Sequence, residues 1–188
     1  MHYEHVLKEI DYVKQEAVFQ DKSGEIRQPY DFLHVVPDHV PHFQLAPFAD
    51  GAQGFVDVDR LTMQHKKYPN VFALGDCTNI AQSKTAASAF SQAPVVVHNI
   101  KQLVDNGRID KAAKFNGYSA CPIYLGGGKL MLAEYNFEGK AASTFFKNQA
   151  YGSEIFFKLA YDLFSKIYYW LMPTGYWFGR HGIIRPRF

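Results

Sequence analysis

The sequence contains little cysteine and little net charge. Only Cys77 and Cys121 occur, which is too few for the disulfide scaffold of a small secreted domain and does not form a CxxC motif. The 20 basic residues are nearly balanced by 18 acidic ones, which leaves a net charge of +2. The chain as a whole therefore lacks the positive field that favours nucleic-acid binding, and we expect no nucleic-acid partner.

Long apolar runs are also missing. No stretch approaches the roughly 18 to 20 apolar residues that span a bilayer, and residues 1–5 do not resemble the start of a signal peptide. The sequence thus predicts neither a transmembrane helix nor an export signal. Its hydrophobic content of 47% over 188 residues argues against disorder and predicts a unit with a substantial core.

The spacing of apolar residues predicts strands in the first part of the chain. Residues 5–28 alternate in a way typical of antiparallel strands joined by a turn at 21–25. The run 32–36 is apolar on both faces, which is typical of a buried strand in an α/β sheet. Alternation at 55–59 and the run 68–74 before Gly75-Asp76 predict a strand that ends in a tight turn.

The second part of the chain shows helical spacing on both sides of a strand region. Small and apolar residues from Thr78 to about Gly107 predict a helix, which Pro94 should kink or divide. Residues 117–146 indicate short strands around a triple-glycine turn at 126–128. Residues 154–171 predict a final helix with one apolar stripe, formed by Phe156, Leu159, Ala160, Leu163, Ile167 and Leu171.

The most informative segment for function runs from Tyr68 to Asp76. A buried strand that ends in Gly75-Asp76 before a helix places a carboxylate at a helix N-terminus, where it can accept hydrogen bonds from ligand hydroxyls. Asp76 could also be a simple N-cap, but the upstream alternation at 55–59 favours a ligand site. The segment resembles the second flavin motif of flavoproteins with two dinucleotide-binding domains, which implies that Asp76 holds the ribityl chain of FAD.

Four further motifs follow in order along the chain, namely Cys77-Thr78-Asn79, Ser83-Lys84-Thr85-Ala86-Ala87, Tyr118-Ser119-Ala120-Cys121-Pro122 and Leu132-Ala133-Glu134-Tyr135. Together with the flavin motif they resemble the sulfide:quinone oxidoreductase family, in its mitochondrial-type branch and bacterial relatives. The resemblance runs from about Tyr30 into the tail. It implies the C-terminal part of an α/β, Rossmann-like flavoprotein, with FAD bound near Gly75, Asp76, Lys84 and Thr85.

The resemblance also implies a division of the chain and a direction of electron flow. Residues 1–29 would end the second nucleotide-binding-like domain, 30–110 would belong to the FAD-binding domain, and 111–188 would form a C-terminal domain with the quinone site. In this family a pair of cysteines beside the flavin accepts sulfide and holds the sulfane sulfur. Two electrons pass to FAD and then to a membrane quinone, so we expect sulfide and quinone as the two substrates.

The two cysteines differ in what the resemblance implies for them. Cys121 matches the later cysteine of the redox pair, so we expect it to be the catalytic residue, in an accessible and electropositive setting. A lone cysteine in an arbitrary protein is more often a small buried packing residue. Cys77 has no redox role in the resemblance, and we expect it to pack.

The sequence also departs from the family. A complete member has a GxGxxG turn for the FAD pyrophosphate and an earlier redox cysteine, whereas the glycine cluster here lies between predicted strands. We therefore expect the chain alone to bind FAD poorly and to need a further N-terminal part. A truncated gene product, an excised fragment and one half of a split enzyme are the alternatives.

Two other functions stay open at this point. A type II NADH:quinone oxidoreductase would share the architecture, although hydride transfer from NADH needs no thiol such as Cys121. A non-enzymatic, membrane-associating remnant is the second alternative. His39 and His42 flank Pro41 in a predicted loop rather than sharing a helix face, so we expect no metal site.

The tail is rich in aromatic and basic residues. Of the 30 aromatic residues, 12 lie between Tyr151 and Phe188, including the triplets 168–170 and 176–178. The tail also holds five cations and only two anions: Lys158, Lys166, Arg180, Arg185 and Arg187 against Glu154 and Asp162. This composition favours a monotopic attachment to lipid at a bacterial or mitochondrial inner membrane. The apolar stripe could instead pack on the core of the protein.

Overall fold

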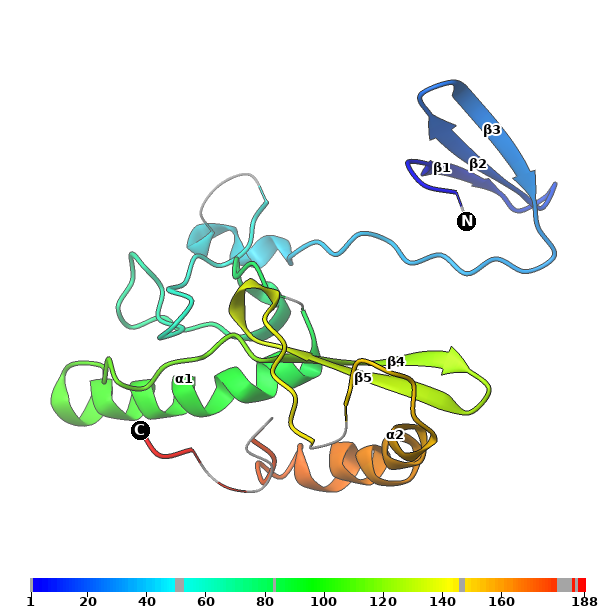
Figure 1. The fold of residues 1–188 in the computed structure, drawn as a ribbon. Helices are drawn as coiled ribbons and strands as arrows, with labels where there is room; N and C mark the ends of the chain where they lie inside the picture. The colour runs from blue at the N-terminus through cyan, green and yellow to red at the C-terminus, as the bar shows by residue number, and fades with distance from the viewer. Residues whose placement is uncertain (1, 50–52, 83, 146–147, 179–183, 185) are drawn as a thin grey trace. The chain divides into compact units, whose positions relative to one another are not determined.

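The structure is a computed structural model in which residues 2–49, 53–82, 84–145, 148–178, 184 and 186–188 are described. The chain divides into two compact units, Met1–His39 and Val40–Phe188. In the described residues the fold is mixed α/β, with strands β1 to β5 and helices α1 and α2 (Figure 1).

The first unit is a three-stranded antiparallel sheet in the order β1-β2-β3. Its strands are β1 (Val6–Asp11), β2 (Glu16–Asp21) and β3 (Gly24–Pro29). The Asp21 carboxylate accepts hydrogen bonds from the backbone N–H groups of Ser23, at 2.6 Å, and Gly24, at 3.0 Å, which fixes the turn between β2 and β3. The prediction of antiparallel strands over residues 5–28 is confirmed.

The predicted buried strand at residues 32–36 is wrong. This segment has no strand structure, and the side chains of Phe32 and Val36 are 84% and 82% exposed. A strand needs a neighbour to take its backbone hydrogen bonds, and no strand pairs with this segment among the described residues. An apolar run alone therefore does not produce a strand.

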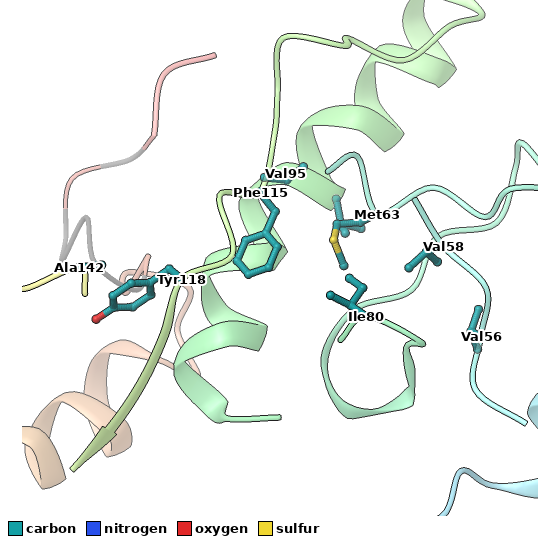
Figure 2. Packing of buried hydrophobic residues seen from close by; sticks show 9 residues of the cluster. Val56, Val58, Met63, Ile80, Val95, Phe115, Tyr118 and Ala142 are labelled. Carbon is teal, nitrogen blue, oxygen red and sulfur yellow. The ribbon is translucent and has the colours of Figure 1, made fainter. Parts of the chain in front are cut away.

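The core of the second unit joins residues from distant parts of the chain (Figure 2). Its buried members are Val56, Val58, Met63, Ile80, Val95, Val96, Phe115, Tyr118 and Ala142. The strands predicted at 55–59 and 68–74 occur only as isolated bridges, among them Val56–Thr78, Val58–His65 and Gln64–Phe72. The chain turns too soon for a longer ladder, because the Asp59 carboxylate binds the backbone N–H groups of Leu61 and Thr62 at 3.0 and 2.8 Å.

Helix α1 (Ala86–Asn106) lies against this core and is continuous through Pro94. It begins later than predicted, because Thr85 is the N-cap and its hydroxyl accepts a hydrogen bond from Ser88 N. It ends as predicted at Gly107, whose φ of 69° gives the left-handed C-cap that glycine adopts readily. Proline removes one helical hydrogen bond, but the buried side chains on both sides of it hold the helix together.

The hairpin of β4 (Ser119–Gly126) and β5 (Lys129–Tyr135) confirms the predicted strands around the triple-glycine turn. The predicted tail helix is also present. It begins as α2 (Glu154–Lys158) and continues in π-helical turns over Leu159–Phe164 and Ile167–Leu171. In the part of the chain that the structure describes, no helix combines the length and apolar character needed to cross a membrane.

The first part of the tail helix packs on the hairpin. Phe156 is buried with Leu130 and Leu132, and Leu159 and Ala160 pack beside them. This part of the predicted stripe therefore belongs to the protein's own core, whereas Leu163 is exposed. Of the predicted tail cations, Arg180 and Arg185 lie outside the described residues.

Candidate functional site

The four residues predicted to bind a cofactor lie together. Gly75, Asp76, Lys84 and Thr85 line one small hollow between the 3-10 turn Gly75–Cys77 and the start of α1. We call these four residues and Cys77 the polar turn. Ser83, which belongs to the same motif, lies outside the described residues.

Hydrogen bonds to the first turns of α1 hold the polar turn in place. Gly75 has a φ of +72°, and its N–H donates to the Gln92 side chain at 2.6 Å. The Thr78 hydroxyl donates to the Gly75 carbonyl at 2.9 Å. A side chain at position 75 would be strained by this backbone conformation, which explains the glycine before Asp76.

Lys84 is fixed by backbone oxygens, while the Asp76 carboxylate faces outward. Lys84 Nζ donates to the carbonyls of Asp76 and Thr78, both at 2.8 Å, and lies 4.3 Å from the centroid of the Phe55 ring. Burial lowers the pKa of Lys84, and the negative charge of Asp76 opposes that shift. The carboxylate of Asp76 is exposed and is therefore accessible to a ligand.

The exposed side of the polar turn could hold a polar ligand. An exposed carboxylate is a hydrogen-bond acceptor for ligand hydroxyls, and it lies near the N-terminus of a 21-residue helix, where the helix dipole favours negative ligand charge. The hollow behind it holds only about 10 Å³, enough for a single water molecule. Only the exposed rim of the polar turn is thus open to a larger ligand.

The two cysteines occupy different settings. Cys77 is half-buried, and its thiol donates to the Leu74 carbonyl at 3.3 Å. Cys121 is a free, exposed thiol at the third residue of β4, paired with Ala133 of β5. Burial is the main cause that raises the pKa of Tyr168 in the tail helix.

Both sequence neighbours of Cys121 line an apolar pocket of about 90 Å³. Ala120 and Pro122 form part of one wall, and residues of the tail helix, including Tyr168, form another. The remaining lining residues are Ala87, Tyr118, Leu132, Glu134, Thr144, Phe145, Phe164, Ile167, Met172 and Trp177. The pocket therefore lies between the hairpin and the tail helix, beside the strand that carries Cys121.

A buried carboxylate at this pocket was missed by sequence reasoning. Glu134 is buried and accepts hydrogen bonds from the Tyr118 hydroxyl, from N and Oγ1 of Thr144 at 2.8 and 2.7 Å, and from Gln149 Nε2 at 2.6 Å. These donors satisfy the carboxylate without a cation. A glutamate directly after the apolar run Leu130–Ala133 was the available signal, because charged residues are rarely buried without a partner.

The prediction of no metal centre rested on the histidines. Among the residues that the structure describes, no group of three or more His, Cys, Asp or Glu side chains is placed to hold a metal ion. The His42 ring accepts a hydrogen bond from Gln44 N at 3.3 Å, which caps a short 3-10 helix, Phe43–Phe48. This contact gives His42 a local structural role.

Comparison with known proteins gives relatives over nearly the whole chain. The mitochondrial sulfide:quinone oxidoreductase of Mus musculus is 40% identical over 184 residues, which cover 95% of this chain and 40% of that protein. The corresponding proteins of Schizosaccharomyces pombe and Dictyostelium discoideum are 38% and 39% identical, over 100% and 98% of this chain and 42% and 41% of theirs. No family model matches the sequence.

A solved structure shares the fold. A chain in the cryo-EM structure of the Tetrahymena thermophila mitochondrial ATP synthase, an F1Fo composite tetramer, superposes with a TM-score of 0.77 at 26% identity. The match covers 89% of this chain and 41% of that chain. In sequence, the chain spans about two fifths of the length of its curated relatives. The predicted resemblance is confirmed: the chain is a homologue of part of the sulfide:quinone oxidoreductases.

Proposed function

We propose that this chain supplies part of the flavin, sulfur and quinone sites of a sulfide:quinone oxidoreductase. The observation that carries the proposal is the position of Cys121. It is an exposed thiol on a strand whose adjacent residues line an apolar pocket, in a chain about 40% identical to such enzymes. Cys121 would carry the sulfane sulfur as a persulfide, and the two electrons released when sulfide is oxidised to that level would pass to FAD. The pocket on the other face of the strand, lined by Ala120 and Pro122, would accept an apolar partner.

FAD, when bound, accepts two electrons from the sulfur chemistry and passes them to the quinone. In our proposal the Asp76 carboxylate binds the ribityl hydroxyls, and Gly75 lets the chain turn sharply enough to present it. Lys84 binds the carbonyls of Asp76 and Thr78, and Thr85 is the N-cap of α1. In our proposal these contacts hold Asp76 close to the start of the helix. The assignment of residues 30–110 to the FAD-binding domain is part of this proposal.

The apolar pocket suits a quinone head group. Its walls are mostly aliphatic and aromatic side chains, and its polar part comes from Tyr118, Glu134 and Thr144. Ligand pockets commonly combine an apolar lining with a few polar groups that fix orientation. We assign the quinone to this pocket, within the C-terminal domain that comprises residues 111–188.

We further propose that the tail attaches the protein to the surface of a membrane. Tyr169, Trp170 and Tyr176 are exposed, and Lys158, Lys166 and Arg187 lie in the same tail. Aromatic and basic residues are typical of helices that lie in the lipid interface. Phe156 of the predicted apolar stripe is buried in the core of the protein. We therefore propose that the aromatic triplets 168–170 and 176–178, rather than that stripe, face the lipid.

A chimera tests the enzymatic proposal. This chain would replace the matching two fifths of the mouse relative, and flavin bleaching and quinone reduction would be measured with sulfide and, separately, with NADH. We expect bleaching and quinone reduction with sulfide only. A folded, flavin-loaded chimera that responds to NADH but not to sulfide would contradict the proposal and favour a type II NADH:quinone oxidoreductase.

A further inference from the structure

The tip of the β4–β5 hairpin carries exposed apolar side chains that the tail prediction did not include. Ile123, Tyr124 and Leu125 are 38%, 61% and 54% exposed. The three glycines that follow have positive φ, and a Cβ on any of them would meet nothing within 4 Å. The hairpin thus ends in a protruding apolar tip that borders open space (Figure 1).

This tip is continuous with the start of the tail helix. The Tyr124 ring meets the Phe157 ring edge to face at 5.6 Å between centroids, and Phe157 stacks on Tyr161 at 6.4 Å. Leu125 lies over the chain just before α2, where a Cβ on Gly152 would come within 2.7 Å of its Cδ1. Hairpin and helix therefore form one surface held by packing, rather than two independently moving parts.

Tyr161, which stacks on Phe157, continues this surface along the helix, and two more exposed apolar residues lie nearby in the sequence. Ile155 and Tyr161 are 62% and 70% exposed, and Tyr151 precedes them with 71% exposed. We call these three residues together with Ile123, Tyr124 and Leu125 the tip surface. Large exposed apolar patches mark interaction sites rather than ordinary protein surface.

We infer that the tip surface inserts into the interface of a lipid bilayer, as a second contact beside the aromatic triplets of the tail. The inference rests on the proposed membrane attachment and extends it to a strand turn. Tyrosine and aliphatic side chains on a convex tip suit the boundary between headgroups and acyl chains. Lys129 and Lys158 add positive charge that is complementary to anionic headgroups.

The apolar part must carry most of this binding. Glu154 and Asp162 are exposed on the same tail helix as Lys158, and their negative charges equal in number the positive charges of Lys129 and Lys158. Screening by salt weakens only the charged part, since the Debye length at physiological ionic strength is about 8 Å. The contribution of the tip should therefore persist at high salt, whereas a purely ionic attachment would be lost.

A matched pair of double variants tests this inference. Tyr124→Ser with Leu125→Ser removes the apolar groups of the tip, and Tyr12→Ser with Val13→Ser makes the same kind of change in an exposed turn of the first unit. The full chain and each variant are sedimented with phosphatidylcholine vesicles, with and without phosphatidylserine, at low and high salt. Circular dichroism verifies that each variant keeps its secondary structure.

We expect the tip variant to partition on the order of tenfold more weakly at both salt concentrations, and the turn variant to stay within about twofold of the parent. Equal partitioning of the tip variant and the parent would overturn the inference. If Tyr169→Ser with Trp170→Ser still releases the chain in that case, attachment by the tail survives. No vesicle binding by the parent would contradict both proposals.

A spectroscopic probe gives a second test that does not depend on binding strength. An environment-sensitive dye is attached at Leu125→Cys or at Val13→Cys, in a chain that also carries Cys77→Ala and Cys121→Ser. We expect vesicles to shift the emission of the dye at position 125 to the blue and to leave the dye at position 13 unchanged. Unchanged emission of the dye at position 125 would overturn the inference. A tip variant that changes only self-association, measured by light scattering, would assign the surface to a contact with protein instead.

Discussion

The polar turn and the β4–β5 hairpin each hold one cysteine, but they are stabilised by different forces. Backbone and side-chain hydrogen bonds tie the turn to α1 and draw the Cys77 thiol onto the Leu74 carbonyl. The hairpin is held by apolar packing of Leu130, Leu132 and Phe156 on one side, which leaves Cys121 exposed. The hydrogen-bonded turn leaves the Cys77 thiol half-buried, whereas the two-stranded hairpin leaves the Cys121 thiol exposed.

The largest expected effect separates the two thiols by activity. In the chimera, Cys121→Ser should lower sulfide-driven quinone reduction roughly a thousandfold or more, because a serine hydroxyl cannot carry sulfane sulfur. Cys77→Ala should retain activity within about threefold, because only a weak thiol hydrogen bond is removed. Steady-state rates with sulfide measure both, and equal losses in two folded, flavin-loaded variants would contradict the comparison.

The elements that the sequence predicted correctly are those determined by residue patterns within one short segment. Antiparallel strands in residues 5–28, the hairpin turn at 126–128 and the end of α1 at Gly107 follow from alternation and glycine, which act over a few residues. The gathering of Gly75, Asp76, Lys84 and Thr85 also followed, through the resemblance. The strand at 32–36 failed because its formation depends on a partner strand, and a partner is not encoded in the run itself.

A second difference between the regions is how much room their glycines have. A Cβ at Gly117, just before β4, would lie 2.3 Å from Phe137 Cγ and 2.4 Å from Phe137 N, whereas one at Gly75 would lie 3.4 Å from Ala89 Cβ. Both glycines have positive φ, so both substitutions carry a backbone strain of about 1 kcal/mol. We expect Gly117→Ala to destabilise by about 3 kcal/mol or more, since backbone atoms must move, and Gly75→Ala by about 1 kcal/mol.

Urea unfolding followed by circular dichroism measures both losses. Similar midpoints for the two alanine variants would show that the contact of Gly117 with Phe137 relaxes easily. That outcome would remove tight packing as the feature that distinguishes the hairpin from the polar turn.

The buried carboxylate of the hairpin provides a third comparison. Glu134→Gln replaces one acceptor oxygen by a donor that faces the donors of Tyr118, Thr144 and Gln149. We expect a loss of about 1 to 3 kcal/mol in the free energy of unfolding, because a buried donor is left unpaired. Glu138→Gln, which removes only an exposed ion pair with Lys140, should change it by less than about 0.5 kcal/mol. Matching urea midpoints for the two variants would assign Glu134 no structural role.

Glu134 also shows why the candidate site was only partly predictable. Its position in an apolar strand was visible, but its donors come from residues 118, 144 and 149, which no sequence periodicity connects to it. The apolar pocket beside Cys121 likewise depends on how the tail helix packs on the hairpin. Such features arise from tertiary contacts, which patterns within one segment do not report.

The smallest effect concerns the charge of the polar turn, where burial lowers the pKa of Lys84 and the Asp76 carboxylate partly opposes that shift. We expect Lys84 to lose its proton at a lower pH than an ordinary lysine, and Asp76→Asn to lower its pKa further, because the opposing negative charge is removed. Between the folded and unfolded pKa values of Lys84 the unfolded chain holds more protons, so the free energy of unfolding rises with pH in that window.

Titration of reductively ¹³C-methylated lysines by NMR, with the Lys84 resonance assigned from the Lys84→Arg variant, measures the shift of the Lys84 pKa. Asp105→Asn near the other end of α1 should leave the Lys84 resonance unchanged. If Asp76→Asn also leaves it unchanged, the carboxylate does not act on the ammonium group, and the polar turn would present Asp76 to a ligand without electrostatic support from Lys84.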